Sequence, residues 1–350
     1  MGAVRRRTER IFNSLVKRYG LELVPSDVVY DWQRLSALPT GPPAPEDAVL
    51  PAGALEYLRP DNPRLVDLRD RYKAFDSRVT TPALWTEDIV RPQDIPTFRA
   101  DNAYVWQHRG PNMQETAYAL TEFYIRSIDV LGLLEKLSED ELFGASTFVF
   151  DQHVVSRDLL DSILEMYFLE RHLGLFSRDG FNVLDIGAGY GRLAHRMTTA
   201  VPGVSSYLCT DGIAVSTFIC EYYLSFRGLS DKARAVPLDE VESALETQPV
   251  DLAINVHSFS ECTLATIEWW ISLLERRDVR YFMLVPHSGT THKGELLSYD
   301  GKDFGSVIES HGYRLIAKDP KFGDPIVQNF AINPTYHYLF ERQVASATGS

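Results

Sequence analysis

The sequence predicts an α/β protein in which a doubly wound sheet follows a mainly helical N-terminal region. From residue 181 onward, apolar segments of strand length alternate with helical segments, an order typical of a sheet with helices on both faces. Several of the strand segments carry apolar residues on both faces, as buried strands do. A chain of 350 residues with 45% hydrophobic residues is long enough for two domains, which we expect at 1–150 and 151–350.

The N-terminal half is predicted to contain helices separated by a proline-rich connection. Residues 1–20 form a predicted amphipathic helix with six basic residues and one acidic residue. Residues 38–63 hold seven of the 19 prolines, which excludes a regular helix or a central strand there. Helical periodicity returns over 114–138 and 156–174, and Ser156 is the predicted cap of the second of these helices.

The C-terminal half is predicted to hold seven strands. The expected strands are 182–186, 206–210, 234–238, 251–256, 280–285, 313–318 and 336–341. The expected helices between them are 190–200, 213–226, 264–276 and 303–311. Trp269 and Trp270 lie inside one of these helices, where we expect them to pack in the core.

Composition limits the classes of function. The net charge of −13 disfavours nonspecific nucleic-acid binding, which needs Lys and Arg to neutralise phosphates. The three cysteines form no CxxC pair and no even set, so neither a disulfide framework nor a zinc site is expected. The sequence shows no secretory signal and no apolar run long enough to span a membrane, which favours a cytoplasmic protein.

A glycine-rich turn follows the first predicted strand of the sheet. Asp185 ends that strand, and Gly187, Ala188 and Gly189 lead into the next helix. The dinucleotide-binding motif G-x-G-x-x-G requires a third glycine at the position of Arg192, so this sequence does not match that motif. A carboxylate beside the turn would repel a pyrophosphate, but it would suit a cationic amino acid group such as that of S-adenosylmethionine.

A second acid lies at the end of the next strand. Asp211, followed by Gly212, comes 22 residues after Gly189, a spacing suitable for a carboxylate that binds both hydroxyls of a ribose. The segment 183–194, VLDIGAGYGRLA, resembles motif I of the class I S-adenosylmethionine-dependent methyltransferases. That resemblance covers 181–341. It implies a Rossmann-like sheet of seven strands with the last one, 336–341, antiparallel, and it places Leu238 and Asp239 near the adenine of the donor.

The turn after the fourth strand bears on the acceptor. Methyltransferases that act on nitrogen often carry Asn/Asp-Pro-Pro-aromatic here, whereas this chain has Asn255 without either proline. An alcohol acceptor needs a base, and histidine has a suitable intrinsic pKa. We expect His257 to be this base and Glu261 to orient it, with His153 as a rival base and His287 reaching the same crevice.

The segments 257–261, 285–287, 102–107 and 148–162 together resemble the sugar O-methyltransferase group, within which actinobacterial enzymes of methylmannose-polysaccharide synthesis are the narrower likeness. The N-terminal half would then cover the acceptor cleft. The expected acceptor contacts, chosen for aromatic, amide and charged groups that suit a polyhydroxylated ligand, are Tyr104, Gln107, Asp151, Gln152, Arg157 and His287.

The predicted activity is therefore O-methylation of a sugar or glycoside hydroxyl, with S-adenosylmethionine as donor. The acceptor would be a small molecule or an oligosaccharide, and the oligomeric state is left open, with a homodimer as one option. No metal is predicted, although Asp151 and Glu261 could supply oxygen ligands to Mg²⁺. The alternatives are methylation of an aromatic natural product and a non-catalytic scaffold that binds the donor.

Overall fold

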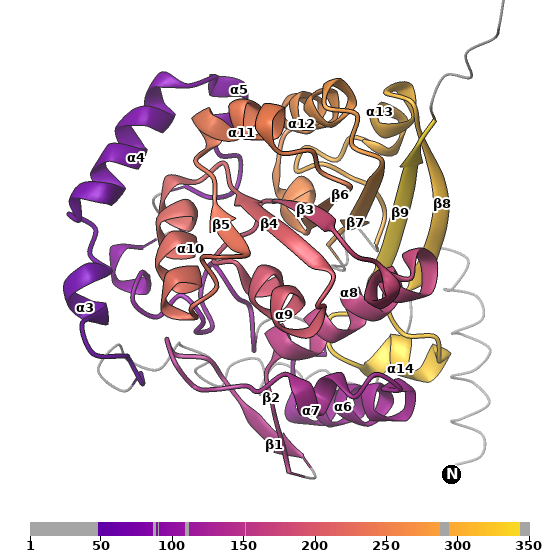
Figure 1. Ribbon diagram of the computed structural model, residues 1–350. Coiled ribbons are helices and arrows are strands. Elements are labelled where there is room, and N and C mark those ends of the chain that lie inside the picture. The colour runs from indigo at the N-terminus through magenta and orange to yellow at the C-terminus, as the bar shows by residue number, and fades with distance from the viewer. Residues whose placement is uncertain are drawn as a thin grey trace, which may run out of the picture. The chain divides into compact units, whose positions relative to one another are not determined.

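A seven-stranded sheet in the order β5-β4-β3-β6-β7-β9-β8 forms the centre of the computed structural model (Figure 1). Its strands are β3 (Phe181–Ile186), β4 (Val204–Thr210), β5 (Ala233–Ala235), β6 (Leu252–Val256), β7 (Tyr281–Val285), β8 (Tyr313–Pro320) and β9 (Tyr336–Arg342). The five strands from β5 to β7 pair in parallel, and β9 runs antiparallel to both β7 and β8. This arrangement confirms the predicted α/β fold, including the antiparallel last strand.

The structure describes residues 48–343 apart from 87, 88, 90, 109–111, 151 and 288–293. The predicted helix over 1–20 and residues 38–47 of the proline-rich segment therefore lie outside the described residues. None of the helices within the described ranges combines the length and apolar character needed to cross a bilayer.

Helices cover both faces of the sheet, as predicted for a doubly wound fold. Those of the C-terminal half are α9 (Arg192–Ala200), α10 (Ala214–Phe226), α11 (Val241–Thr247), α12 (Leu264–Arg276), α13 (Gly305–Ser310) and α14 (Pro325–Phe330). Short 3-10 helices are η2 (Pro92–Asp94), η3 (Leu175–Ser177), η4 (Leu238–Glu240) and η5 (Ser258–Glu261). The strand predicted over 234–238 is shorter because Pro237 cannot donate to a ladder and η4 begins directly after it.

The two sides of the sheet bury two hydrophobic clusters. Along β3, Leu184 and Ile186 pack with side chains of α10 and α12, whereas Val183 packs with side chains of α8 and α9. This division follows from the two-residue period of a strand, which points neighbouring side chains to opposite faces. Trp269 and Trp270 are both buried in the first cluster, as predicted.

The N-terminal region is mainly helical, as predicted. It contains α3 (Ala54–Tyr57), α4 (Pro63–Ala74), α5 (Ser77–Thr80), α6 (Glu115–Ile128), α7 (Leu133–Lys136), a hairpin of β1 (Phe148–Phe150) and β2 (His153–Val155), and then α8 (Arg157–Leu173). The helix expected over 114–138 is divided into α6 and α7, because the Asp129 carboxylate accepts from the backbone of Leu133 and Leu134 and caps a new helix. Ser156 caps α8 as predicted, accepting from the Leu159 N–H at 3.1 Å.

Helix α4 is absent from the sequence-based prediction, although its signals are in the chain. Asn62 accepts from the Arg64 N–H at 2.9 Å, Pro63 is the first helical residue, and Leu65, Leu68 and Tyr72 form its buried face. These side chains belong to the same hydrophobic cluster as those of α10, against which this helix packs. The domain boundary expected at residue 150 falls on the β1–β2 hairpin, and the division there stays a prediction.

A buried ion cluster joins the N-terminal region to the helices of the sheet. Glu139 accepts from Arg99 at 2.5 Å and from Arg196 of α9 at 2.9 Å, and the Arg99 and Glu139 side chains have no exposed surface. The neighbouring Asp140 binds Arg227, which follows α10, at 2.6 Å. Burial alone would raise the pKa of Glu139, but the two guanidiniums lower it below its ordinary value.

Replacing Glu139 with Ala should destabilise the fold by about 3–5 kcal/mol, because two buried guanidiniums would lose their shared counter-charge. Urea unfolding followed by circular dichroism measures this loss. The matched control is Glu242→Ala, which breaks an exposed pair with Arg276 and should cost at most about 1 kcal/mol. Equal losses in the two variants would contradict a supporting role for the buried cluster.

Candidate functional site

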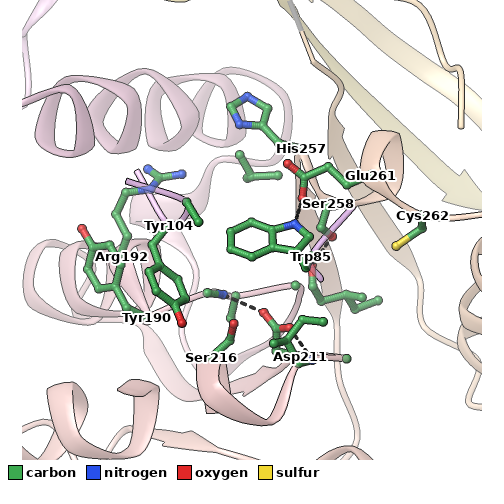
Figure 2. Close-up of a pocket in the computed structure, with 18 of the residues that line it drawn as sticks. Trp85, Tyr104, Tyr190, Arg192, Asp211, Ser216, His257, Ser258, Glu261 and Cys262 are labelled. Carbon is green, nitrogen blue, oxygen red and sulfur yellow. Dashed lines mark hydrogen bonds between the residues drawn. The ribbon is translucent and has the colours of Figure 1, made fainter. Parts of the chain in front are cut away.

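A cavity of about 290 Å³ lies at the carboxyl ends of β3, β4, β6 and β7. In open α/β sheets this is the edge at which ligands bind, next to the point where the strand order reverses. Figure 2 shows part of the side chains that line it. The lining from the C-terminal half includes Asp185, Gly187, Ala188, Gly189, Asp211, Gly212, His257, Ser258, Glu261 and His287, and the lining from the N-terminal half includes Trp85, Tyr104, Trp106, Met113 and Arg157.

The glycine turn forms the floor between β3 and α9. Gly187, Gly189 and Gly191 all have positive φ, at 72°, 57° and 87°. A Cβ at Gly187 would overlap the Ser258 side chain, so any other residue here would force Ser258 to shift. A Cβ at Gly189 would meet nothing within 4 Å, which leaves this part of the turn open to a ligand.

Asn255 ties this turn to the end of β6. Its amide donates to the Ile186 carbonyl at 2.9 Å and to the Ser258 hydroxyl at 2.5 Å, and its Oδ1 accepts from the Phe259 N–H. The side chain is fully buried. Asn255 therefore acts as a brace between two turns of the cavity, a role for which the sequence carried no local signal.

Asp211 places a buried carboxylate beside the glycine turn. Its two oxygens accept from the Gly189 N–H at 3.0 Å and from the Ile213 N–H at 2.9 Å. Burial raises the pKa of Asp211 to about 7, although the two backbone donors act in the opposite direction. The carboxylate is held in place with room on each oxygen for a further donor.

Asp185 adds a second buried carboxylate to the same end of the cavity. It accepts from the Tyr207 hydroxyl at 2.9 Å, and burial raises its pKa to about 7. Arg192 is near enough to lower this pKa, but its guanidinium binds Glu165 of α8 in a bidentate pair at 2.9 Å. The Asp185 carboxylate therefore has no ion pair within the protein, and a cationic group of a ligand could supply one.

Glu261 and His287 form a hydrogen-bonded pair at the other end of the cavity. His287 Nε2 lies 2.8 Å from Glu261 Oε1, and Trp85 Nε1 donates to Glu261 Oε2 at 2.6 Å. The expected pairing of Glu261 with His257 is wrong. His257 begins the η5 turn with φ of 67°, and this turn directs the carboxylate to a histidine 26 residues later in the chain.

His257 stacks on His287 instead of pairing with a carboxylate. The two ring centroids are 4.9 Å apart with an interplanar angle of 15°. Arg157 NH2 and Asn333 Nδ2 each lie 3.5 Å from one ring nitrogen of His257. Burial, together with His287 and Arg157, holds the pKa of His257 well below its ordinary value, so this imidazole is neutral near pH 7.

The N-terminal region supplies an aromatic wall. The rings of Trp85 and Tyr104 lie 5.6 Å apart, and in Figure 2 the indole lies between Asp211 and His257. The Tyr104 hydroxyl is buried without a hydrogen-bond partner among the described residues, so it can bind a ligand. Tyr104 was predicted to line the site, whereas Trp85 was not, because it stands alone in a segment without periodicity.

Several predicted site residues lie outside the cavity lining. Gln107 is buried and donates to the Arg99 carbonyl at 2.5 Å, and Gln152 is exposed in the β1–β2 turn. His153 binds Glu122 of α6 at 2.8 Å. Asp151 lies outside the described residues.

Leu238 and Asp239 are held by helix α4 and are not in the lining. The Leu238 N–H donates to the Tyr72 hydroxyl at 2.8 Å, and Asp239 accepts from Arg71 at 2.8 Å. The resemblance placed these residues near adenine, but both are bound by side chains of helix α4, which was not predicted. Within the described ranges, no group of three His, Cys, Asp or Glu side chains is arranged to hold a metal ion.

The comparisons with known proteins give likenesses in fold. No protein-family model and no curated protein matches the sequence. Among solved structures, the [4+2]-cyclase SpnF is 12% identical with a TM-score of 0.39, covering 65% of this chain and 98% of its own. The StiE O-MT is 13% identical with a TM-score of 0.37, covering 52% and 74%. TrmK of M. capricolum, in complex with S-adenosyl-homocysteine, is 10% identical with a TM-score of 0.33, covering 50% and 68%.

Replacing Gly187 with Ala should destabilise the protein by about 2–4 kcal/mol, because the new Cβ combines a left-handed backbone with an overlap at Ser258. Urea unfolding measures the change. Gly189→Ala is the control, since it shares the positive φ but has open space, and it should cost about 1 kcal/mol. In a Ser258→Gly background the two alanines should cost the same, and an unchanged difference would contradict the steric argument.

Proposed function

We propose that the protein is an S-adenosylmethionine-dependent O-methyltransferase whose acceptor is a sugar or glycoside hydroxyl. One observation carries this proposal. A single cavity holds a glycine turn with two buried carboxylates at one end and a histidine–glutamate pair at the other. The first end suits a cationic donor with a ribose, and the second suits removal of a proton from an alcohol.

The donor end fits S-adenosylmethionine by its chemistry. Asp211 can accept hydrogen bonds from ribose hydroxyls while it keeps its two backbone donors. Asp185 offers a negative charge to the amino acid ammonium group, and the open space at Gly189 admits the ligand close to the backbone. Tyr104 supplies a buried hydroxyl that needs a partner.

His287 is the proposed base. The pKa of Glu261 is lowered, against the effect of burial, by its bonds to His287 and Trp85, so the carboxylate is ionised near neutral pH. An ionised carboxylate can only accept, so the hydrogen of His287 lies on Nε2 and the lone pair on Nδ1. The donor supplies an electrophilic methyl group on a sulfonium. His287 Nδ1 takes the hydroxyl proton as the C–O bond forms and the C–S bond breaks, leaving a neutral thioether.

The charges of the lining favour a neutral acceptor. Both guanidiniums described in the lining are paired with carboxylates of α8, Arg157 with Asp161 at 3.1 Å and Arg192 with Glu165. Neither is left to bind a phosphate, which disfavours nucleic acids and phosphorylated acceptors. The aromatic wall of Trp85, Tyr104 and Trp106 suits the flat or apolar face of a ring.

The direct test is release of S-adenosylhomocysteine by purified protein over a panel of acceptors. The panel holds mannosides, glucosides, partly methylated versions, a simple phenol, a short RNA and no acceptor. Release that depends on a glycoside supports the proposal. The aromatic wall also favours a second candidate, methylation of an aromatic natural product, and release with the phenol alone would select it. Release with RNA alone would contradict the neutral acceptor.

Replacing Asp185 with Asn should raise stability and weaken donor binding together. The folded-state pKa of Asp185 is about 7, above the ordinary value of 3.8, so ionisation costs stability as the pH rises through this range. At pH 8 the variant should melt about 2–5 °C higher, and at pH 4 the gain should vanish. Its affinity for S-adenosylmethionine should fall about tenfold at pH 8, measured by calorimetry.

The wild-type protein should bind the donor about tenfold more weakly at pH 6 than at pH 8, as Asp185 and Asp211 become protonated. The control for Asp185→Asn is Asp278→Asn, because the Asp278 side chain is 81% exposed. This variant should change neither the melting temperature nor the affinity for the donor. Donor affinity that is equal at the two pH values would contradict the role of the buried carboxylates.

Replacing His287 with Ala should lower kcat at least about 100-fold, as loss of a general base does, and leave donor affinity within about twofold. His257→Ala should cost less, about tenfold, because His257 supports the ring of His287 by stacking. His153→Ala is the matched control, since it breaks a similar histidine–glutamate pair outside the cavity. A larger loss in His257→Ala than in His287→Ala would transfer the base role to His257.

A further inference from the structure

Trp85 connects the N-terminal region to the carboxylate of the proposed base pair. Its indole Nε1 lies 2.6 Å from Glu261 Oε2, and the same carboxylate uses Oε1 to bind His287 at 2.8 Å. Trp85 lies 176 residues before Glu261 in the chain, and His287 lies 26 residues after it. The two oxygens of one carboxylate thus serve two different partners.

Both bonds are needed for Glu261 to hold one orientation. The Glu261 side chain is 13% exposed, and a buried carboxylate without sufficient donors is costly. An indole N–H can only donate, so it stabilises the ionised form and cannot compete for the proton of His287. If Oε2 had no donor, the carboxylate could rotate away from the imidazole, and the hydrogen of His287 would no longer be confined to Nε2.

The ring of Trp85 has a separate packing role. It lies against Tyr104, with centroids 5.6 Å apart, and lines the cavity. Replacement by Ala would remove the ring and the hydrogen bond together. Replacement by Phe keeps a ring and removes the N–H, so Trp85→Phe isolates the hydrogen bond.

We propose that Trp85 is a positioning residue, whose indole N–H fixes the Glu261 carboxylate so that Glu261 holds His287 in the tautomer with its hydrogen on Nε2. This inference rests on the proposed function for its effect on turnover. The hydrogen-bond chain itself is independent of any reaction. The chain consists of Trp85, Glu261 and His287, and its first member comes from the N-terminal region.

The first experiment is ¹H–¹⁵N NMR on the full chain without donor or acceptor. Trp85→Phe assigns the indole signal of Trp85 by removing it. In Glu261→Gln this signal should move upfield by about 1 ppm, because a charged acceptor is replaced by a neutral one. The His287 ring should show the Nε2–H tautomer in the wild type and a mixture of tautomers in Trp85→Phe.

The second experiment is a double-mutant cycle on kcat with an acceptor from the panel. Trp85→Phe should lower kcat about tenfold in the wild type and less than about twofold in Glu261→Gln, since the effect acts through Glu261. The control is Trp106→Phe, which changes another indole of the lining that has no bond to Glu261. Its effect should be the same in both backgrounds.

The outcomes separate this inference from the proposed function. An indole signal that is unchanged in Glu261→Gln, or a single His287 tautomer in Trp85→Phe, overturns the positioning role whether or not the protein transfers methyl groups. Equal kcat losses in the two backgrounds overturn it as well. Absence of methyl transfer in the wild type would refute the proposed function, and the NMR results would then decide the positioning role alone.

Discussion

The close approach of the glycine turn to the turn after β6 is the constraint on which the site depends. Gly187 lacks a side chain where Ser258 packs, and Asn255 bonds to both turns from beneath. Because the two turns touch, the carboxylates at the ends of β3 and β4 and the residues that follow β6 open into one cavity. A larger residue at Gly187 would separate the two halves of that cavity.

Buried charge is distributed unevenly around the cavity. The guanidiniums of Arg157 and Arg192 line the cavity and are paired with the carboxylates of Asp161 and Glu165 of α8. Asp185 and Asp211, by contrast, have only neutral donors, and burial raises the pKa of each to about 7. Ionisation of these two carboxylates therefore lowers the stability of the folded, ligand-free protein, and a cationic ligand would offset that loss. Stability and ligand affinity are thus linked at Asp185 and Asp211.

The N-terminal region is part of the site as well as a cover for it. Helix α4 bonds to Leu238 and Asp239, the buried cluster around Glu139 binds α9 and α10, and Trp85 reaches Glu261. These contacts hold the aromatic wall against the sheet. Residues that precede the sheet thus complete one end of the cavity in a class of fold that many activities share.

The sequence by itself determined the elements whose signals are local. The alternation of strands and helices, the glycine turn between Asp185 and Arg192, and the cap at Ser156 could all be predicted, because each depends on neighbours within a few residues. That Asp185 and Asp211 lie near each other could be predicted for the same reason, since they stand at the ends of adjacent parallel strands.

The tertiary structure alone decided how the side chains around Glu261 are paired. His257 and Glu261 are four residues apart, so a pair was a reasonable expectation, but the backbone at His257 turns with φ of 67° and Glu261 meets His287 and Trp85. Leu238 and Asp239 likewise meet Tyr72 and Arg71 of helix α4, which lies more than 150 residues earlier in the chain. Hydrogen bonds between distant segments depend on how helices, strands and loops pack together. The spacing of residues along the sequence does not specify that packing.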